Sequence, residues 1–314
     1  MIFKAAAGCS LAVAIGAGIF RRHQLETHKV ATNLFKYLRL RYTLSNAGWG
    51  RLLLLADFDR TLTTASCGVS CHGVVESCQE LSRDYREATK VLFEKYYPIE
   101  TSATMTREEK IPLMTEWYTR AHELLLKEPF TPELLDATAA KSAIALRPGC
   151  DELFALCHDK ATPLVVCSAG LGNVVQACLK HRLQDERAVA ALPQLPVVSN
   201  WLRFDDAGVV NGFSQPLLHM FNKDGAFVKS QIGDSRWNAL STGRSVCLVL
   251  GDGLGDAAMA DGLGLTNVVK IGFLNETDPA RVAARLPAFE DAFDIVLLGD
   301  QSFEYVLKML RGLK

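Results

Sequence analysis

The sequence lacks an excess of charge of either sign. Its 314 residues include 34 lysines and arginines and 35 aspartates and glutamates, which gives a formal net charge of −1. With no basic or acidic tail, the overall charge gives no reason to expect a nucleic-acid partner. The sequence also lacks repeats and low-complexity tracts, and a hydrophobic content of 49% is typical of a folded protein. The length allows one large domain or two smaller ones.

A regular disulfide framework is not apparent either. The nine cysteines are odd in number and scattered, and some lie inside apolar runs, such as Cys167 and Cys247. A thiol in such a run behaves as a small core side chain, and this usage favours a reducing compartment. Cys67, Cys71 and His72 form a C-x₃-C-H cluster, but no second pair of matching spacing accompanies it. Buried or idle thiols are therefore favoured over a zinc site.

The N-terminal apolar run, residues 5–20, has sixteen residues without a charge. It falls short of the roughly 20 residues that span a bilayer comfortably. A signal-anchor, a cleaved signal peptide and an organellar targeting segment are all compatible with it. The basic residues that follow favour keeping the rest of the chain on the cytosolic side. We therefore expect possible membrane association through residues 5–20, an N-terminal segment at 1–22, a basic linker or helix at 23–50, and a cytoplasmic domain beyond.

From residue 51 onwards, short apolar runs alternate with segments of helical pattern. The runs lie at 52–59, 162–170, 245–253, 267–273 and 293–300. Runs that are hydrophobic throughout, spaced by amphipathic segments, predict parallel strands covered by helices on both faces. The expected fold class is therefore α/β, with a doubly wound, Rossmann-like parallel sheet.

One long stretch interrupts this alternation, with dense helix signals and no convincing strand. Thr106 and Glu109 form a capping box, and Thr131 followed by Pro132 marks a second helix start. A helical block inserted after the first strand of a parallel sheet predicts a separate cap domain. The expected boundaries are 51–70 and 148–314 for the core, 71–147 for the cap, and 63–72 and 144–150 for the hinges.

Two acids, Asp57 and Asp59, stand where the first apolar run ends. Ligands bind beyond the carboxyl ends of strands in open parallel sheets, and burying two unpaired acids is costly, which suggests a bound cation. Asp57 is suited to attack phosphorus as a carboxylate nucleophile. Asp59 is suited to protonate the leaving oxygen and then to take a proton from water. An ordinary turn at a strand end is the competing interpretation.

The segment Gly251-Asp252-Gly253-Leu254-Gly255-Asp256 ends another apolar run in the same way. Oxygen ligands from Asp57 and Asp252, with a backbone carbonyl and waters, predict an octahedral Mg²⁺ site. The spacing G-x-G-x-G differs from the dinucleotide fingerprint, and the adjacent carboxylates would repel a pyrophosphate. A dinucleotide site is therefore rejected.

Two further segments are suited to binding an anion. Ser168 and Ala169 end a third apolar run just before a helical segment, where a hydroxyl and backbone N–H groups can bind phosphate. Lys223 can offset charge that develops on phosphoryl oxygens. Taken singly, the first pair is an ordinary strand-to-helix turn and Lys223 is a solvated surface lysine.

In combination, these segments resemble the four motifs of the haloacid dehalogenase superfamily over nearly all of residues 51–314. A closer resemblance, to the cytosolic pyrimidine 5′-nucleotidases, lies in EKYYPIE (94–100), EEK (108–110), EWYT (116–119), VVSN (197–200) with FD (204–205) and GV (208–209), and HMFNK (219–223).

The resemblance implies an enzyme, a Mg²⁺-dependent phosphomonoesterase that hydrolyses pyrimidine nucleoside 5′-monophosphates through an aspartyl-phosphate. It implies roles for residues already singled out and for one more, Glu100, which reads the base from the cap. The implied roles are nucleophile and acid/base for Asp57 and Asp59, phosphate contacts for Ser168, Ala169 and Lys223, Mg²⁺ ligands for Asp57, Asp59 and Asp252, and support of Lys223 or a metal-bound water for Asp256.

The sequence departs from the family pattern where the substrate is recognised. Ala121 replaces the serine that usually precedes the histidine after the W-Y-T segment, so one nucleotide contact is missing. The loop between Asp59 and His72 is shorter than usual, and Asn222-Lys223-Asp224-Gly225 lacks one residue of the familiar run. The alternatives are a phosphatase that prefers 7-methylguanosine monophosphate, a phosphoserine-type phosphatase, and a non-catalytic membrane-tethered module.

Overall fold

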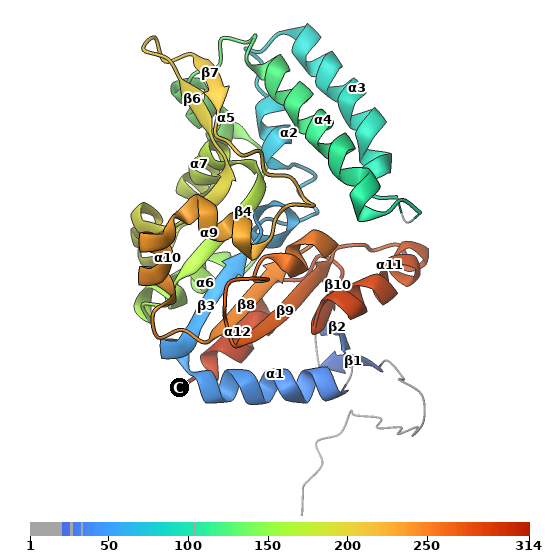
Figure 1. Ribbon diagram of the computed structural model, residues 1–314, viewed down its shortest axis with the longest axis vertical. Helices are drawn as coiled ribbons and strands as arrows, with labels where there is room; N and C mark the ends of the chain where they lie inside the picture. Colours follow the sequence, from blue (N-terminus) through green and yellow to red (C-terminus); the bar gives the residue numbers. More distant parts are fainter. Residues whose placement is uncertain (1–20, 26–27, 33, 103) are drawn as a thin grey trace, which may run out of the picture.

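The computed structural model describes residues 21–25, 28–32, 34–102 and 104–314 of the chain. Its centre is an eight-stranded sheet in the order β1-β2-β10-β9-β8-β3-β4-β5 (Figure 1). The strands are β1 (Arg21–Leu25), β2 (His28–Thr32), β3 (Leu52–Ala56), β4 (Leu164–Leu171), β5 (Val197–Asn200), β8 (Val246–Gly251), β9 (Asn267–Leu274) and β10 (Ile295–Leu298). All neighbours from β10 to β5 pair in parallel, whereas β2 pairs antiparallel with both β1 and β10.

The five predicted apolar runs correspond to β3, β4, β8, β9 and β10, so the α/β fold with a parallel sheet is confirmed. Several strands were not predicted. Most of β1 and all of β2 come from the stretch expected to be a basic linker or helix, and β5 closes the opposite edge. A separate hairpin, β6 (Leu202–Phe204) with β7 (Val210–Phe213), follows β5. These strands have only three to five residues, too few for a clear apolar period.

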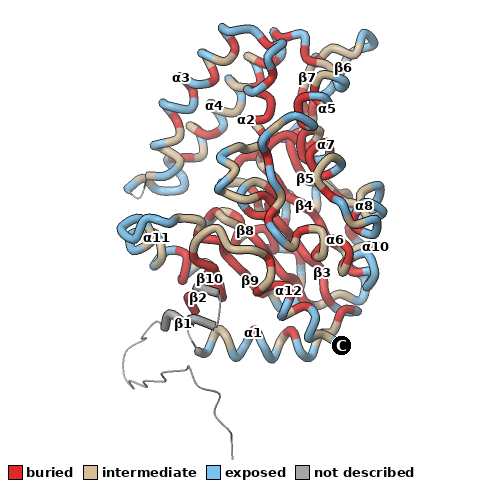
Figure 2. Tube along the Cα trace, turned by 180° about the vertical axis from the view of Figure 1, so that it is seen from behind, coloured by how far each residue is buried: buried red, intermediate tan, exposed pale blue. Residues whose placement is uncertain are grey.

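Helices cover both faces of the sheet, because successive side chains of each strand point to opposite sides. Leu52 and Leu54 of β3 belong to a large hydrophobic cluster, and Leu53 and Leu55 belong to another. The first cluster includes side chains of α1 (Leu34–Ala47), α6 (Cys150–Asp159), α7 (Gly172–Arg182), α8 (Glu186–Ala191) and α12 (Glu304–Arg311). The other face is covered by α9 (Gly225–Ile232), α10 (Asp234–Ser241) and α11 (Pro279–Ala292). Figure 2 shows the strands as the buried centre of the molecule.

Four helices lie between β3 and α6 and form the helical insertion: α2 (Cys71–Glu76), α3 (Arg83–Glu100), α4 (Arg107–Leu125) and α5 (Pro132–Lys141). The predicted capping box of Thr106 and Glu109 opens α4, and Thr131 caps α5 with Pro132 in its first turn. Figure 1 shows α3 and α4 side by side beyond one end of the sheet. They share a small cluster around Tyr96, whereas α2 and α5 contribute to the main core.

The two linkers of this helical insertion run next to each other. Thr63 and Leu146 form an isolated antiparallel bridge, and the Arg147 amide donates to the Leu62 carbonyl at 2.8 Å. The chain therefore leaves and re-enters the core at adjacent points. The division into a core and a cap at 71–147 stays a prediction.

The predicted N-terminal apolar segment, residues 5–20, lies outside the described residues. In the part of the chain that the structure covers, no helix combines the length and the hydrophobicity needed to cross a bilayer. The eight cysteines of that part are all free thiols.

Candidate active site

Three carboxylates meet where two neighbouring strands end. Asp57 follows β3, and Asp252 and Asp256 follow β8, which runs parallel to β3 with Ala56 opposite Leu250. One oxygen of each acid lies within 4.8 Å of the others. Gly251 makes this approach possible, because a Cβ there would lie 2.2 Å from the Cβ of Asp256. The structure thus brings together the two predicted ligands, Asp57 and Asp252, with Asp256 beside them.

Lys223 is buried between two of these acids. Its Nζ donates to Asp57 Oδ1 at 2.5 Å and to Asp256 Oδ1 at 2.8 Å. The second oxygen of Asp256 accepts from the backbone N–H groups of Asp252 and Gly253, at 3.0 and 2.9 Å. Both oxygens of Asp256 are therefore occupied. Taken singly, Lys223 would have been interpreted as a surface lysine, but the structure leaves it only 3% exposed. Its predicted contact with phosphate stays a prediction.

One oxygen of Asp57 is left over. Within the described part of the chain, Oδ2 of Asp57 is buried and has no hydrogen-bond partner. An unsatisfied buried acceptor costs about 1–3 kcal/mol, so this oxygen calls for a ligand. A divalent cation bound by Asp57 and Asp252 would satisfy it with the oxygen chemistry that Mg²⁺ prefers.

The pKa values of the clustered acids are shifted by burial and by their charged neighbours. Burial raises the pKa of Asp57 to about 7, although Lys223 opposes the shift. Burial, followed by repulsion from Asp57, raises the pKa of Asp252 well above its ordinary value. Burial lowers the pKa of Lys223, but Asp256 and Asp57 outweigh it and hold the ammonium charged. A bound cation would reverse the shifts of both acids, because it favours their ionised forms.

Asp59 lies apart from the three clustered carboxylates. It lies in the turn Phe58–Leu62, where its own backbone is extended (φ −66°, ψ 125°), and its Oδ1 accepts from the Cys71 amide at 2.9 Å. Its side chain is therefore no member of the cluster, and the predicted contact with the metal would have to come from its backbone. Burial raises the pKa of Asp59 to about 6, which brings it close enough to neutral pH for the carboxyl both to donate and to accept a proton.

Ser168 and Ala169 lie towards the end of β4, the neighbour of β3. Ser168 is 1% exposed, and its Oγ accepts from the Gly170 amide at 3.1 Å. A Cβ at Gly170 would lie 2.6 Å from the Cβ of Cys71, so the strand end and α2 are in close approach. Helix α7 begins directly after this strand, as the predicted phosphate site requires.

Glu100 is the last residue of α3, in the helical insertion. Burial raises its pKa to about 7, with Arg60 and Lys110 opposing the shift. Burial lowers the pKa of Arg60, but Asp252 and Tyr97 outweigh it, so this guanidinium lies between a core acid and a cap hydroxyl. Burial, then Glu100 and Asp59, raise the pKa of Tyr118. Tyr118 of the insertion therefore lies near both Glu100 and Asp59.

Aromatic rings surround this part of the insertion. Trp117 of α4 stacks on Tyr96 of α3, with ring centroids 5.8 Å apart and planes 13° apart. Phe93 and Tyr97 stack at 4.7 Å, and Trp117 and Tyr118 meet edge to face at 6.0 Å. A planar base held against these rings would gain contact area as well as hydrogen bonds.

Arg147 is a residue that the sequence analysis missed. It is 1% exposed, and its guanidinium donates to the main-chain oxygens of Arg60 at 2.5 Å and Thr61 at 2.7 Å. It also donates to the side chains of Asp300 and Asn275, each at 3.1 Å. The sequence around it, AIALRPG, was interpreted only as a chain break. A single arginine at the end of an apolar run was the signal that was available.

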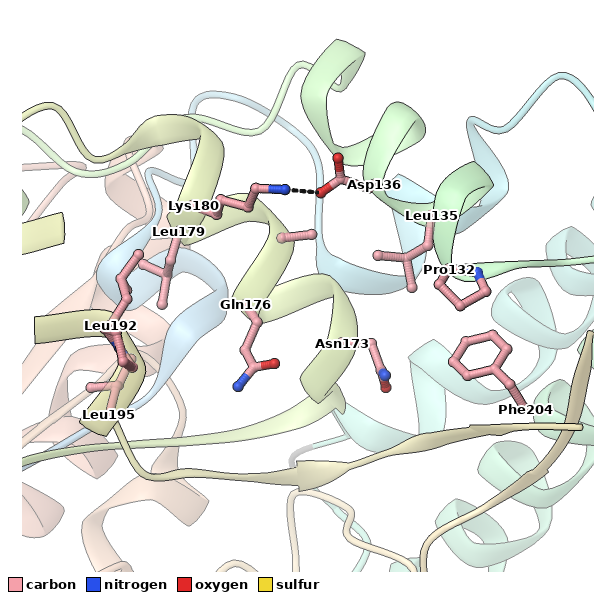
Figure 3. A pocket seen from close by; sticks show the side chains of 12 residues that line it. Pro132, Leu135, Asp136, Asn173, Gln176, Leu179, Lys180, Leu192, Leu195 and Phe204 are labelled. Carbon is pink, nitrogen blue, oxygen red and sulfur yellow. Dashed lines mark hydrogen bonds and ion pairs between the residues drawn. The ribbon is translucent and has the colours of Figure 1, made fainter. Parts of the chain in front are cut away.

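A hollow of about 450 Å³ lies elsewhere, between α5, α7 and β6 (Figure 3). Pro132, Leu135, Leu179 and Phe204 give it an apolar lining, and Lys180 pairs with Asp136 at its edge at 2.9 Å. Among the described residues that line it are none of the predicted site residues. The chemistry of the strand ends, rather than the shape of the surface, locates the candidate site.

The family is decided by comparison with known proteins. A family model described as pyrimidine 5′-nucleotidase (UMPH-1) matches residues 58–314. The chain belongs to the pyrimidine 5′-nucleotidase family. The predicted resemblance is confirmed, and members of this family are phosphomonoesterases with a haloacid dehalogenase-like fold.

Individual relatives agree with this family. A 7-methylguanosine phosphate-specific 5′-nucleotidase of Gallus gallus is 37% identical over 273 residues, 85% of this chain and 90% of the relative. A protein of the same description from Drosophila melanogaster is 36% identical over 81% of this chain and 77% of its own length. The crystal structure of cytosolic 5′-nucleotidase IIIB bound to cytidine has a TM-score of 0.79 and 32% identity, covering 92% of this chain and 94% of that one. The chain is therefore a 5′-nucleotidase, and a non-catalytic module is not supported.

Proposed function

We propose that the protein hydrolyses nucleoside 5′-monophosphates to nucleoside and inorganic phosphate, with Mg²⁺, through an aspartyl-phosphate on Asp57. The observation that carries this proposal is the environment of the Asp57 carboxylate. Lys223 binds Oδ1, Oδ2 is buried without a partner among the described residues, and the carboxylate clusters with that of Asp252. Such an arrangement holds a carboxylate in one orientation and leaves it able to bind a cation.

Two carboxyl groups would share the reaction. Asp57 attacks phosphorus, the bond from phosphorus to the 5′-oxygen breaks, and Asp59 gives its proton to that oxygen. Asp59 then takes a proton from a water that attacks the aspartyl-phosphate, which releases phosphate and restores Asp57. Asp57 and Asp252, with the Asp59 backbone, would hold Mg²⁺, which offsets the negative charge of the phosphate. Ser168, the Ala169 amide and Lys223 would bind the phosphoryl oxygens.

Glu100 is proposed to select the base. Its carboxylate lies near Tyr118, which also lies near Asp59, and Tyr118 meets Trp117 edge to face, so a base can stack on these rings. A carboxylate accepts hydrogen bonds from an exocyclic amine or a ring N–H, and cytosine offers an amine. The pyrimidine description of the family and the cytidine in the related structure support this choice.

A second substrate, 7-methylguanosine monophosphate, is favoured by a specific observation. Relatives from several animals at 31–37% identity are described as specific for it. Its methylated base carries a positive charge and N–H donors, so it would be attracted to the Glu100 carboxylate and would stack well on Trp117 and Tyr118. Ala121 supplies no hydroxyl, so the base contacts would depend more heavily on Glu100.

Turnover of cytidine, uridine and 7-methylguanosine monophosphates, with phosphoserine as a non-nucleotide control, tests the proposal. Each substrate is measured with Mg²⁺ and after chelation, and Asp57→Asn serves as the inactive control. We expect hydrolysis of at least one of the nucleotides only with Mg²⁺, and little hydrolysis of phosphoserine. Equal turnover of phosphoserine would refute nucleotide specificity, and turnover by Asp57→Asn would refute the aspartyl-phosphate.

We also propose that residues 5–20 tether a cytoplasmic catalytic domain to a membrane. The uncharged, apolar composition of this segment and the basic residues after it support the proposal. Fractionation of the full chain with and without residues 1–22 tests it, because the shortened chain should be active and no longer sediment with membranes.

A further inference from the structure

Helix α1 displays large apolar side chains to solvent. Phe35 is 78% exposed, Leu38 is 56% exposed and Tyr42 is 75% exposed. Residues three and four apart lie on the same face of a helix, so these three side chains form one stripe. Among the described residues, α3 exposes two large apolar side chains, Val91 and Phe93, which are two positions apart and so do not share a face, and the others lie singly on separate elements. A stripe of this kind marks a surface that binds something.

The helix that carries the stripe is held firmly to the body of the protein. Leu40 and Leu44, on its opposite face, are 1% and 3% exposed within the main core. Lys36 donates to the Phe293 carbonyl at 3.0 Å, and Arg39 pairs with Asp294 at 2.5 Å. The stripe is therefore a fixed surface rather than an incidental property of a loose segment.

The charged residues that α1 itself contributes are all basic. The first 56 residues contain eight lysines and arginines and a single acid, Glu26, although the whole chain has a net charge of −1. No acid occurs anywhere in α1. Arg39 and Arg41 flank the stripe on its two sides at helical spacing, and Arg41 is exposed beside Tyr42. Basic residues that border an apolar and aromatic stripe match a surface with negative headgroups above an apolar interior.

The position of α1 suits such a surface. Figure 1 shows α1 across the end of the sheet opposite α3 and α4, which lie over the candidate active site. Contact at α1 would leave the catalytic acids facing away. In the sequence, thirteen residues separate the sixteen uncharged residues 5–20 from α1, so the two regions that favour a membrane are close along the chain.

We propose that the α1 face, formed by Phe35, Leu38, Arg41 and Tyr42, binds the surface of an anionic lipid bilayer. The apolar side chains enter the headgroup layer, and Arg41 pairs with lipid phosphates or carboxylates. The face lies in the plane of the membrane and does not span it. It sets the orientation of the enzyme, which a flexible tether alone would leave free.

Depth-dependent quenching tests this proposal on the full chain. Tyr42→Trp places a fluorophore on the face, and Val189→Trp places one on α8, where Val189 is 42% exposed. With phosphatidylserine-containing vesicles that carry brominated acyl chains, the emission added by Tyr42→Trp should be quenched and that added by Val189→Trp should not. Quenching of both or of neither, while the protein is bound to vesicles, would overturn the proposal.

Binding of the variant Phe35→Ser/Leu38→Ser provides a second measurement. Its affinity for vesicles with phosphatidylserine should fall roughly tenfold or more, and turnover of a soluble nucleotide should not change. Unchanged vesicle affinity would assign all membrane binding to residues 5–20 and overturn the role of α1. A dimer of the wild-type chain that this variant dissociates would identify the occupant as a second copy, and would overturn it too.

Discussion

The guanidinium of Arg147 donates a hydrogen bond of 2.5 Å to the main-chain oxygen of Arg60, a residue 87 positions earlier. Arg60 follows Asp59 directly and has φ of 59°, in the left-handed region. That conformation costs a non-glycine residue about 1–2 kcal/mol, so neighbouring contacts must stabilise it. Asn275 provides a second stabilising contact, since its Nδ2 donates to the main-chain oxygen of Arg60 at 2.9 Å. The turn that aims Asp59 is thus held from the second linker of the insertion.

Arg147→Lys should lower kcat about 10- to 100-fold with a smaller change in KM, because lysine cannot donate to all of these oxygens at once. Arg244→Lys is the matched control. Arg244 also donates to main-chain oxygens, those of Trp49 and Ala161 at 2.7 and 2.8 Å, but at a distance from the site. Both variants should lose thermal stability, and only the first should lose kcat. Equal losses of kcat would mean that Arg147 acts only through stability.

Asp57→Asn should abolish turnover, because an amide is not a nucleophile. Asp59→Asn should slow hydrolysis of a nucleotide by about 10²- to 10⁴-fold, because proton transfer to the leaving oxygen is lost. The loss should be smaller for p-nitrophenyl phosphate, whose leaving group needs no proton. Steady-state rates on both substrates measure the difference, and an equal loss on both would contradict the acid role of Asp59.

Exhaustive chelation should abolish activity, and added Mg²⁺ should restore it, because the clustered acids offer hard oxygen ligands. Asp252→Asn should raise the Mg²⁺ concentration needed for half-maximal activity. The variant Asp261→Asn, which removes a largely exposed carboxylate that pairs with Lys270 at 3.3 Å, should leave that concentration unchanged. Full activity after chelation would exclude the metal from the reaction.

The selectivity of Glu100 should depend on pH. Its pKa is about 7 because burial disfavours the charge, so it is largely protonated below that pH and ionised above it. The ratio of kcat/KM for cytidine monophosphate to kcat/KM for a small phosphate ester should therefore rise as pH increases through 7. Dividing the two values removes the titration of the shared catalytic acids. In the variant Glu100→Gln, this ratio should be low and independent of pH. If the ratio rises equally with pH in the wild-type protein and in the variant, Glu100 does not bind the base through its carboxylate.

The parts of the fold that could be predicted are those that depend on a few consecutive residues. Continuous apolar runs located β3 and β8. Because the carboxyl ends of parallel strands lie at the same edge of a sheet, Asp57 and Asp252 were expected to lie close together. The capping box at Thr106 was predicted for the same reason, since it depends on four consecutive residues. The resemblance to a family added Glu100, which local patterns would have left as a solvated carboxylate.

Contacts between distant parts of the chain were beyond this reasoning. The burial of Lys223 depends on Asp57 and Asp256, which are 166 and 33 positions away. Arg147 owes its role to partners on several loops, and no local pattern distinguishes it from a surface arginine. The antiparallel addition of β2 to β10 joins opposite ends of the chain, so the segment that contains β2 was expected to be a linker or helix.

The paired linkers of the insertion have a consequence for how such an enzyme can change. Thr63 and Leu146 are bridged, so the chain enters and leaves the insertion at a single place on the core. A different set of helices could be connected to the core there without moving a strand of the sheet. The acids at the strand ends would keep their places while the surface that selects the substrate was replaced. The range of substrates can therefore diverge between related proteins while the bond-breaking chemistry is inherited unchanged.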